Sequence, residues 1–114
     1  MGLIFVFGSN LAGRHGAGAA RTAAMHYGAK RGQGVGLQGQ SYAIPTKDKN
    51  LNPLPLTIIF TYVRQFVNFA ENHPELTFYV TRIGCGLAGY KDSDISPMFR
   101  GAPTNCSLPE GWRK

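Results

Sequence analysis

Hydrophobic and polar positions along the chain alternate in blocks that predict strands and helices in turn. The run Leu3–Phe7 is apolar throughout, as expected for a strand covered on both faces in a parallel sheet. In GAGAARTAAMHYG, residues 16–28, small apolar residues recur at helical spacing, and Gly28 suits the C-terminal end of a helix. The segment SYAIPT, residues 41–46, then predicts a short strand that ends at Pro45.

The most regular pattern in the second half of the chain predicts a helix. Apolar residues from Ile58 to Ala70 recur in an i, i+1, i+4, i+5 pattern, which is typical of a helix with one buried face. The helix is expected to end near Asn72, because Pro74 disfavours helical backbone in the residue before it. We expect its aromatic residues to belong to the core or to an interface rather than to a base-stacking surface.

A further strand and two short elements complete the pattern. The segment LTFYVTRI, residues 76–83, predicts a buried strand, and the glycine-rich segment GCGLAGY, residues 84–90, follows it at once. A short helix is expected to begin near Ser93 or Ser96. A last short strand is expected within residues 104–108.

Two segments lack any helical or strand period and are predicted to be connections. These are RGQGVGLQGQ, residues 31–40, and KDKNLNPLP, residues 47–55. The remaining order of strand, helix, strand, helix, strand, helix predicts an α/β layered fold with a largely parallel sheet. A length of 114 residues fits one domain spanning residues 1–114.

Glycine-rich segments follow two of the three main predicted strands. In open α/β sheets, ligands bind beyond the carboxyl ends of the strands, where residues 8–18, 45–50 and 84–90 are expected to lie. A phosphate needs several backbone N–H groups around it, and a Cβ atom often blocks its approach. A helix beginning near Gly18 adds free N–H groups and a positive dipole end. The pattern therefore favours a dinucleotide or an ADP-ribose-type ligand whose diphosphate lies between two loops.

Other phosphate-binding and catalytic patterns fit less well. The segment GRHGAG is not followed by Gly-Lys-Ser/Thr, as in a P-loop, and it does not match the dinucleotide fingerprint G-x-G-x-x-G with a later acidic residue. A hydride-transfer enzyme is therefore not expected. Cys85 and Cys106 match no metal spacing and form no C-x-x-C pair, so both are expected to be free thiols. We expect neither a cofactor nor a metal.

Charge and hydropathy narrow the class of protein only slightly. Twelve Lys and Arg against six Asp and Glu give a net charge of +6, which favours an anionic partner but is scattered along the chain. No apolar run approaches the roughly 20 residues that span a bilayer, and the N-terminus lacks the features of a signal peptide. A cytoplasmic location without a membrane partner is expected, and the oligomeric state stays open.

Three segments together resemble one known family. The segment GSNLAGRHGAGAA, residues 8–20, looks like the macro-domain signature. The segments YAIPTKDK, residues 42–49, and TRIGCGLAGY, residues 81–90, resemble those of macro domains related to the terminal ADP-ribose glycohydrolase. The resemblance covers about residues 3–100 and extends to small macro-like proteins common in bacteriophage genomes. It implies a three-layer α/β/α fold with a mostly parallel mixed sheet, shortened at its N-terminus, that binds ADP-ribose or a related NAD-derived nucleotide.

The resemblance also implies roles for individual residues. Asn10 would bind the distal ribose, Tyr90 would contact the distal sugar, and Lys47 matches the region that supplies a catalytic lysine. The tentative catalytic residues are Asn10, His15 and Lys47. The expected ligand-binding residues are Gly8, Ser9, Asn10, His15, Gly16, Ala17, Gly18, Thr46, Lys47, Gly84, Cys85, Gly86, Leu87, Ala88, Gly89 and Tyr90.

Departures from the family pattern decide the order of the functional hypotheses. Ala88 stands where the glycohydrolases carry an aspartate, Asp92 follows four residues later, and Phe7 replaces the first Asn of the usual motif. Binding without turnover is therefore the first hypothesis. Hydrolysis of an ADP-ribose linkage, with His15, Lys47 or Asp92 as acid or base, is the second. A basic nucleic-acid-binding module is the third, and an interaction protein with a decayed pocket is the fourth.

Several of these residues also have an ordinary structural interpretation. Arg14 could contact phosphate but is expected to be a surface charge, and Lys47 could belong to a solvated turn. His26 and His73 lie on the predicted helices or near their ends without partners, so they are assigned no role. Trp112 is expected to anchor the C-terminal tail against the core rather than to stack on a base.

Overall fold

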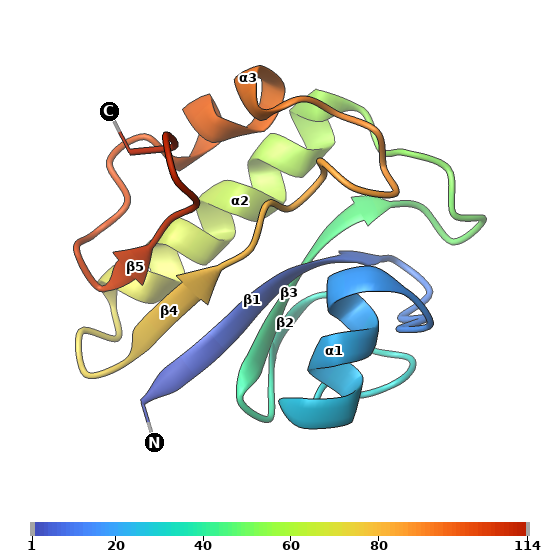
Figure 1. Ribbon diagram of the computed structural model, residues 1–114, viewed down its shortest axis with the longest axis horizontal. Coiled ribbons are helices and arrows are strands. Elements are labelled where there is room, and N and C mark those ends of the chain that lie inside the picture. Colours follow the sequence, from blue (N-terminus) through green and yellow to red (C-terminus); the bar gives the residue numbers. More distant parts are fainter. Residues whose placement is uncertain (1, 114) are drawn as a thin grey trace.

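The computed structural model describes residues 2–113, and its elements follow one another in nearly the predicted order. Figure 1 shows them along the chain. They are β1 (Leu3–Asn10), α1 (Gly18–His26), β2 (Gly36–Gln38), β3 (Ser41–Lys47), α2 (Leu56–Glu71), β4 (Thr77–Val80), α3 (Asp92–Ile95), the 3₁₀ helix η1 (Ser96–Phe99) and β5 (Cys106–Ser107).

The five strands form one mixed sheet in the order β2-β3-β1-β4-β5. β1 lies at the centre and pairs in parallel with β3 and with β4, and β5 pairs in parallel with β4. Only β2 runs antiparallel, at the edge beside β3. The carboxyl ends of β3, β1 and β4 therefore meet at the same end of the sheet, with β1 between the other two.

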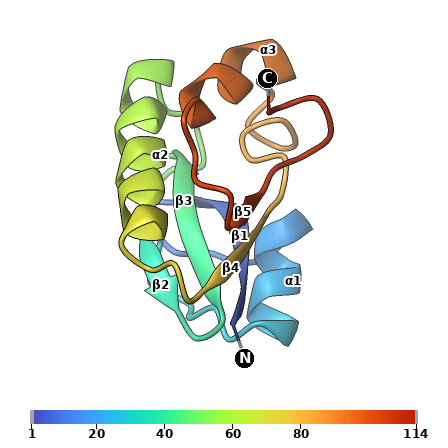
Figure 2. The same cartoon turned by 90° about the vertical axis from the view of Figure 1, so that its left-hand side faces the viewer.

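Helices cover both faces of this sheet, which makes three layers. Figure 2 shows α1 and α2 on opposite sides of the strands. Alternation along β1 supplies both cores: Phe5 and Phe7 pack with alanines of α1, whereas Ile4 and Val6 face the larger cluster beneath α2. The predicted α/β layered fold with a largely parallel sheet is confirmed.

The long helix α2 owes its position to the apolar stripe that the sequence shows. Its buried residues are Ile59, Val63, Phe66, Val67 and Ala70. The predicted end near Asn72 is also confirmed, since Asn72 is the C-cap residue. Beyond this end, the Asn105 side chain donates to the carbonyls of Ala70, His73 and Leu76, all at 3.1 Å, and so ties the loop before β5 to the helix terminus.

Two strands are longer than the sequence predicts. β1 continues past Phe7 to Asn10, and β3 continues past Pro45 to Lys47. Pro45 is tolerated because β2 pairs only with Ser41–Ala43, so one edge of β3 is unpaired at the proline.

β4 is shorter and more exposed than predicted. It ends at Val80, and Thr77 and Tyr79 lie at the surface, whereas Phe78 and Val80 are buried. The predicted buried strand is therefore buried on one face only, because α1 packs against β1 and β3 and leaves the other face of β4 open.

The segment 31–40 is not entirely a loop, because it contains the edge strand β2. A strand of three residues is too short to show a period of two. The buried Gln38 side chain organises the segment: its Oε1 accepts from the Lys30 N–H at 2.7 Å, and its Nε2 donates to the Gln33 carbonyl at 3.1 Å.

Within residues 2–113, no helix has both the length and the apolar character needed to cross a membrane.

Candidate functional site

A cavity of about 580 Å³ opens at the carboxyl ends of β1, β3 and β4. It lies where the sequence predicts a ligand, between the two glycine-rich segments. The lining residues are Gly8, Ser9, Asn10, Arg14, Gly16, Ala17, Gly18, Ala19, Ala20, Thr46, Lys47, Leu51, Thr81, Arg82, Ile83, Gly84, Gly86, Leu87 and Ala88.

The N-terminus of α1 forms one wall of this cavity. Its N-cap residue, Ala17, has no side chain that could accept a hydrogen bond, and the first turn contains no acidic residue. The amides of the first helical turn therefore lack the side-chain partner that usually satisfies them. A Cβ atom built on Gly16 would meet no protein atom within 4 Å, so the glycine leaves open space beside these N–H groups.

The segment 84–90 also contributes to the cavity lining, through Gly84 and residues 86–88, and brings a second set of backbone amides. Two hydrogen bonds fold it: the Tyr90 N–H donates to the Gly84 carbonyl at 2.8 Å, and the Gly89 N–H donates to the Gly86 carbonyl at 3.0 Å. By contrast, the N–H groups of residues 86–88 have no hydrogen-bond acceptor among residues 2–113. Gly86 resembles Gly16 in that an added Cβ would meet only open space.

The charge of the cavity is of one sign. Arg14, Lys47 and Arg82 line it, and no Asp or Glu of the described chain does. Arg14 and Lys47, together with two sets of unpaired amides, make the cavity a favourable place for an anion, whereas the charge of Arg82 is offset by its ion pair with Asp92.

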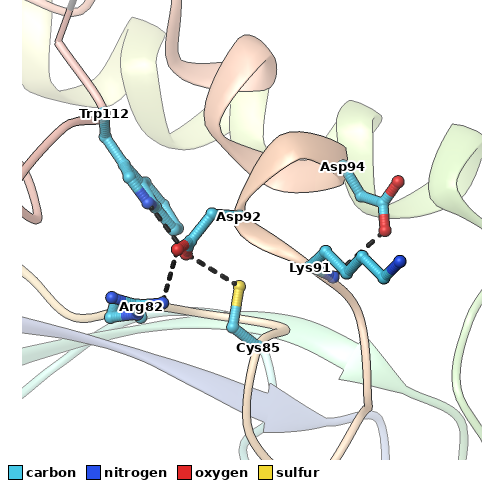
Figure 3. Close-up of polar contacts among 6 residues, drawn as sticks. All are labelled: Arg82, Cys85, Lys91, Asp92, Asp94 and Trp112. Atoms are coloured by element: carbon cyan, nitrogen blue, oxygen red, sulfur yellow. Dashed lines mark hydrogen bonds and ion pairs between the residues drawn. The ribbon is translucent and has the colours of Figure 1, made fainter.

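Asp92 holds one of these cations in place, as Figure 3 shows. Its carboxylate pairs with the Arg82 guanidinium and also accepts hydrogen bonds from the Trp112 indole at 3.1 Å and from the Cys85 thiol at 3.6 Å. Trp112 is 5% exposed, so it anchors the tail against the core as expected. Asp92 itself lies outside the cavity lining.

The Cys85 thiol is a poor nucleophile in this setting. Burial, followed by the hydrogen bond from the thiol to Asp92 and the charge of that residue, raises the pKa of Cys85 to about 11. A thiol with a raised pKa stays protonated near neutral pH and reacts slowly. Both cysteines are free, as the sequence predicts.

Twelve of the predicted ligand-binding residues line the cavity, and four do not. Those outside the lining are His15, Cys85, Gly89 and Tyr90. The Tyr90 hydroxyl donates to the Leu54 carbonyl at 2.6 Å, which joins the segment 84–90 to the connection before α2. Its hydroxyl proton is thus engaged within the protein, and its contact with a distal sugar stays a prediction.

His15 is buried beneath the first glycine segment rather than exposed in it. Its ring is 0% exposed, Nε2 lies 2.9 Å from the Lys30 carbonyl, and the ring packs edge-on against Phe7 at a centroid distance of 5.3 Å. Because no atom of His15 lines the cavity, the structure does not support the expected acid–base role there. The histidine is part of the packing between β1 and the segment after α1.

Asn10 lies in the cavity lining, but its amide is already engaged. Nδ2 donates to the Arg14 carbonyl at 2.8 Å, and Oδ1 accepts from the Arg14 N–H at 3.0 Å. Ser9 and Thr46 are similarly occupied, because the Ser9 hydroxyl donates to the Gly34 carbonyl and the Thr46 hydroxyl donates to the Ser9 carbonyl. These side chains shape the cavity floor.

Several lining residues had no distinctive signal in the sequence. Thr81 and Arg82 were expected inside the strand predicted over residues 76–83, and they reach the cavity because β4 ends at Val80. Arg14 is exposed at the surface, as expected, and it also lines the cavity. Leu51 lies in the polar connection after β3, where a single leucine carries no pattern.

Residues 2–113 contain no cluster of three or more His, Cys, Asp or Glu side chains that could hold a metal ion.

A scan against models of protein families, a search of curated proteins and a search of solved structures each found no match for this chain. The interpretation of the cavity therefore depends on its own geometry and on the resemblance of three sequence segments.

Proposed function

We propose that this protein binds ADP-ribose or a related NAD-derived nucleotide, with the diphosphate held between the N-terminus of α1 and the segment 84–90. One observation carries the proposal. Residues 18–20 of the uncapped first turn of α1 and residues 86–88, whose N–H groups have no acceptor within 2–113, line the same cavity, together with three cationic residues and no carboxylate.

A diphosphate matches this arrangement in charge and in hydrogen bonding. Phosphate oxygens accept hydrogen bonds from backbone amides, and a helix N-terminus adds a favourable dipole. Two separate sets of amides suit two linked phosphate groups better than one. Gly16 and Gly86 leave the space that such a close approach of ligand to backbone requires.

The size of the cavity favours a whole nucleotide over a free anion. Its volume of about 580 Å³ lies within the range of small-molecule sites, which is roughly 300–1,000 Å³. A diphosphate alone would leave much of this space empty, including the part lined by Leu51 and Leu87. The resemblance of residues 3–100 to macro domains points to the same ligand class, and we propose a macro-like fold on that basis.

Binding without turnover fits the lining better than hydrolysis does. No carboxylate or imidazole of the described chain lines the cavity, which leaves Lys47 as the one tentative catalytic residue in the lining with an ionisable side chain. A hydrolase of this kind would need a further acid or base, and Asp92 is engaged by Arg82, Cys85 and Trp112.

Calorimetric titration with ADP-ribose and with a short DNA duplex, each at low and at high salt, tests the proposal. We expect ADP-ribose to bind at both salt concentrations, and Lys47→Met to weaken it about tenfold, while the exposed neighbour Lys49→Met leaves it unchanged. Binding of DNA alone, with a steep loss at high salt, would instead identify a basic nucleic-acid-binding surface.

A further inference from the structure

Leu51 has an unusual backbone conformation beside the cavity. Its φ is +66°, and it is the one non-glycine residue within 2–113 with a positive φ. Leucine pays a steric cost in this left-handed region, whereas asparagine tolerates it better. Asparagines stand on both sides, at positions 50 and 52, yet the left-handed position is occupied by leucine.

The turn around Leu51 is held firmly enough to maintain this conformation. The Asp48 carboxylate accepts hydrogen bonds from the N–H groups of Asn50 and Asn52, both at 2.9 Å. The Asp48 N–H donates to the Asn52 carbonyl at 2.8 Å, and the Leu51 N–H donates to the Asp48 carbonyl at 3.0 Å. Residue 51 is thereby fixed at the cavity with its side chain 41% exposed.

Leu87 is the counterpart of Leu51 on the other side of β1. It belongs to the segment that follows β4, whereas Leu51 belongs to the connection that follows β3, and these two strands flank β1. Leu87 is 70% exposed, more than any other large hydrophobic residue described, and it also lines the cavity. Two exposed leucines thus lie at one cavity, on loops from opposite sides of the central strand.

We propose that Leu51 and Leu87 form an apolar subsite for the planar nucleobase of the ligand; this inference rests on the proposed function. Aliphatic side chains offer no hydrogen bonds, so neither phosphates nor sugar hydroxyls gain from contact with them. The faces of a purine do gain, because their apolar area leaves water. No aromatic side chain among residues 2–113 lines the cavity, so these leucines take the place of a stacking ring.

A subsite of this kind selects a flat ring more than a particular base. Neither leucine can form a hydrogen bond to the ring edge that distinguishes adenine from guanine. We therefore expect the adenine and guanine forms of the nucleotide to bind within a few-fold of each other. The pyrimidine forms, with smaller rings, should bind more weakly.

The experiment compares two probes, ADP-ribose and inorganic pyrophosphate, by calorimetry on the wild-type chain, Leu51→Gly and Leu87→Ser. Leu37→Ser, an exposed leucine on the edge strand β2 outside the cavity, is the matched control. We expect each cavity variant to lose about tenfold in affinity for ADP-ribose, with pyrophosphate affinity and the control unchanged. Leu51→Gly should also keep or raise the melting temperature, since glycine accepts a positive φ without cost.

Each alternative result has a distinct meaning. Unchanged ADP-ribose affinity in both cavity variants would overturn the subsite while leaving the proposed function standing. An equal loss for both probes would also overturn it, because the leucines would then act on the loops rather than on the base. Failure of the wild-type chain to bind either probe would overturn the proposed function itself, and the subsite with it.

Discussion

The amide group of Asn10 forms two hydrogen bonds with the backbone of Arg14, donating to its carbonyl at 2.8 Å and accepting from its N–H at 3.0 Å. Asn10 ends β1 and is 5% exposed, so this pair closes the first glycine-containing turn at the cavity floor. Arg14 is thereby fixed in the lining. The asparagine therefore shapes the loop that lines the cavity.

Replacing Asn10 by alanine should therefore cost stability. Both backbone groups of Arg14 would lose a partner in a partly buried place, which lowers the free energy of unfolding by about 2 kcal/mol. Urea denaturation followed by circular dichroism measures this change. Asn68→Ala, on the exposed face of α2, is the control and should leave stability unchanged or slightly raised. Equal stability of Asn10→Ala and the wild-type chain would show that the two hydrogen bonds do not hold the loop.

Two glycines of the cavity lining, Gly16 and Gly86, and Gly34 outside it have opposite expected effects on binding and stability. Valine at Gly16 or Gly86 meets no protein atom at its Cβ, so the fold should be kept while ADP-ribose affinity falls at least tenfold. Alanine at Gly34 would place its Cβ 2.1 Å from the Asn10 carbonyl oxygen, so that variant should be strongly destabilised. Melting temperature and calorimetry separate the two effects, with Gly2→Val as a remote control. Normal affinity in both valine variants would argue against close contact between ligand and backbone.

The burial of His15 predicts how the histidines react with diethyl pyrocarbonate. His26 lies exposed at the end of α1, whereas the His15 ring is inaccessible. Peptide mapping by mass spectrometry should find His26 modified in the folded protein, and His15 modified only after unfolding in urea. Rapid modification of His15 in the folded chain would restore it as a candidate acid or base at the site.

The raised pKa values of the two cysteine thiols predict that the protein loses stability at alkaline pH. Burial is the largest cause that raises the pKa of both Cys85 and Cys106 to about 11 in the folded protein, above their ordinary value of 9.0. A raised folded-state pKa stabilises the fold fully below the unfolded value, and this stabilisation is lost as the pH rises from about 9 towards 11. The urea concentration at the midpoint of unfolding, measured from pH 7.5 to 10.5, should therefore fall at the upper end of this pH range. The fall should be smaller in Cys106→Ala. A midpoint that does not change with pH would mean that folding does not raise the pKa of either thiol.

The position of the cavity could be predicted from sequence, but its detailed chemistry could not. Glycine-rich segments after two apolar runs mark strand ends in an α/β fold, and the helix beginning at Gly18 follows from alanine spacing. The burial of His15 depends on a contact with Lys30, and the engagement of Asn10 depends on a local turn. Neither contact leaves a periodic signal.

Residues whose position depends on a local turn or on the end of a strand were the hardest to predict from the sequence. Arg82 lines the cavity because β4 ends early, at Val80, and Asp92 restrains its guanidinium from a separate helix. Leu51 depends on the hydrogen bonds of Asp48, which a polar connection does not reveal in its sequence. These features come from register and turn geometry rather than from hydrophobic patterning.

The most direct test is a nuclear magnetic resonance titration of the ¹⁵N-labelled protein with ADP-ribose at high salt. We predict that the largest amide shifts occur at Gly18–Ala20 and Gly86–Ala88, because their N–H groups would become hydrogen-bond donors to phosphate. The amides of α2 should stay unchanged. Saturable shifts confined to other surfaces, or no shifts at all, would contradict a diphosphate site between the two glycine-rich segments.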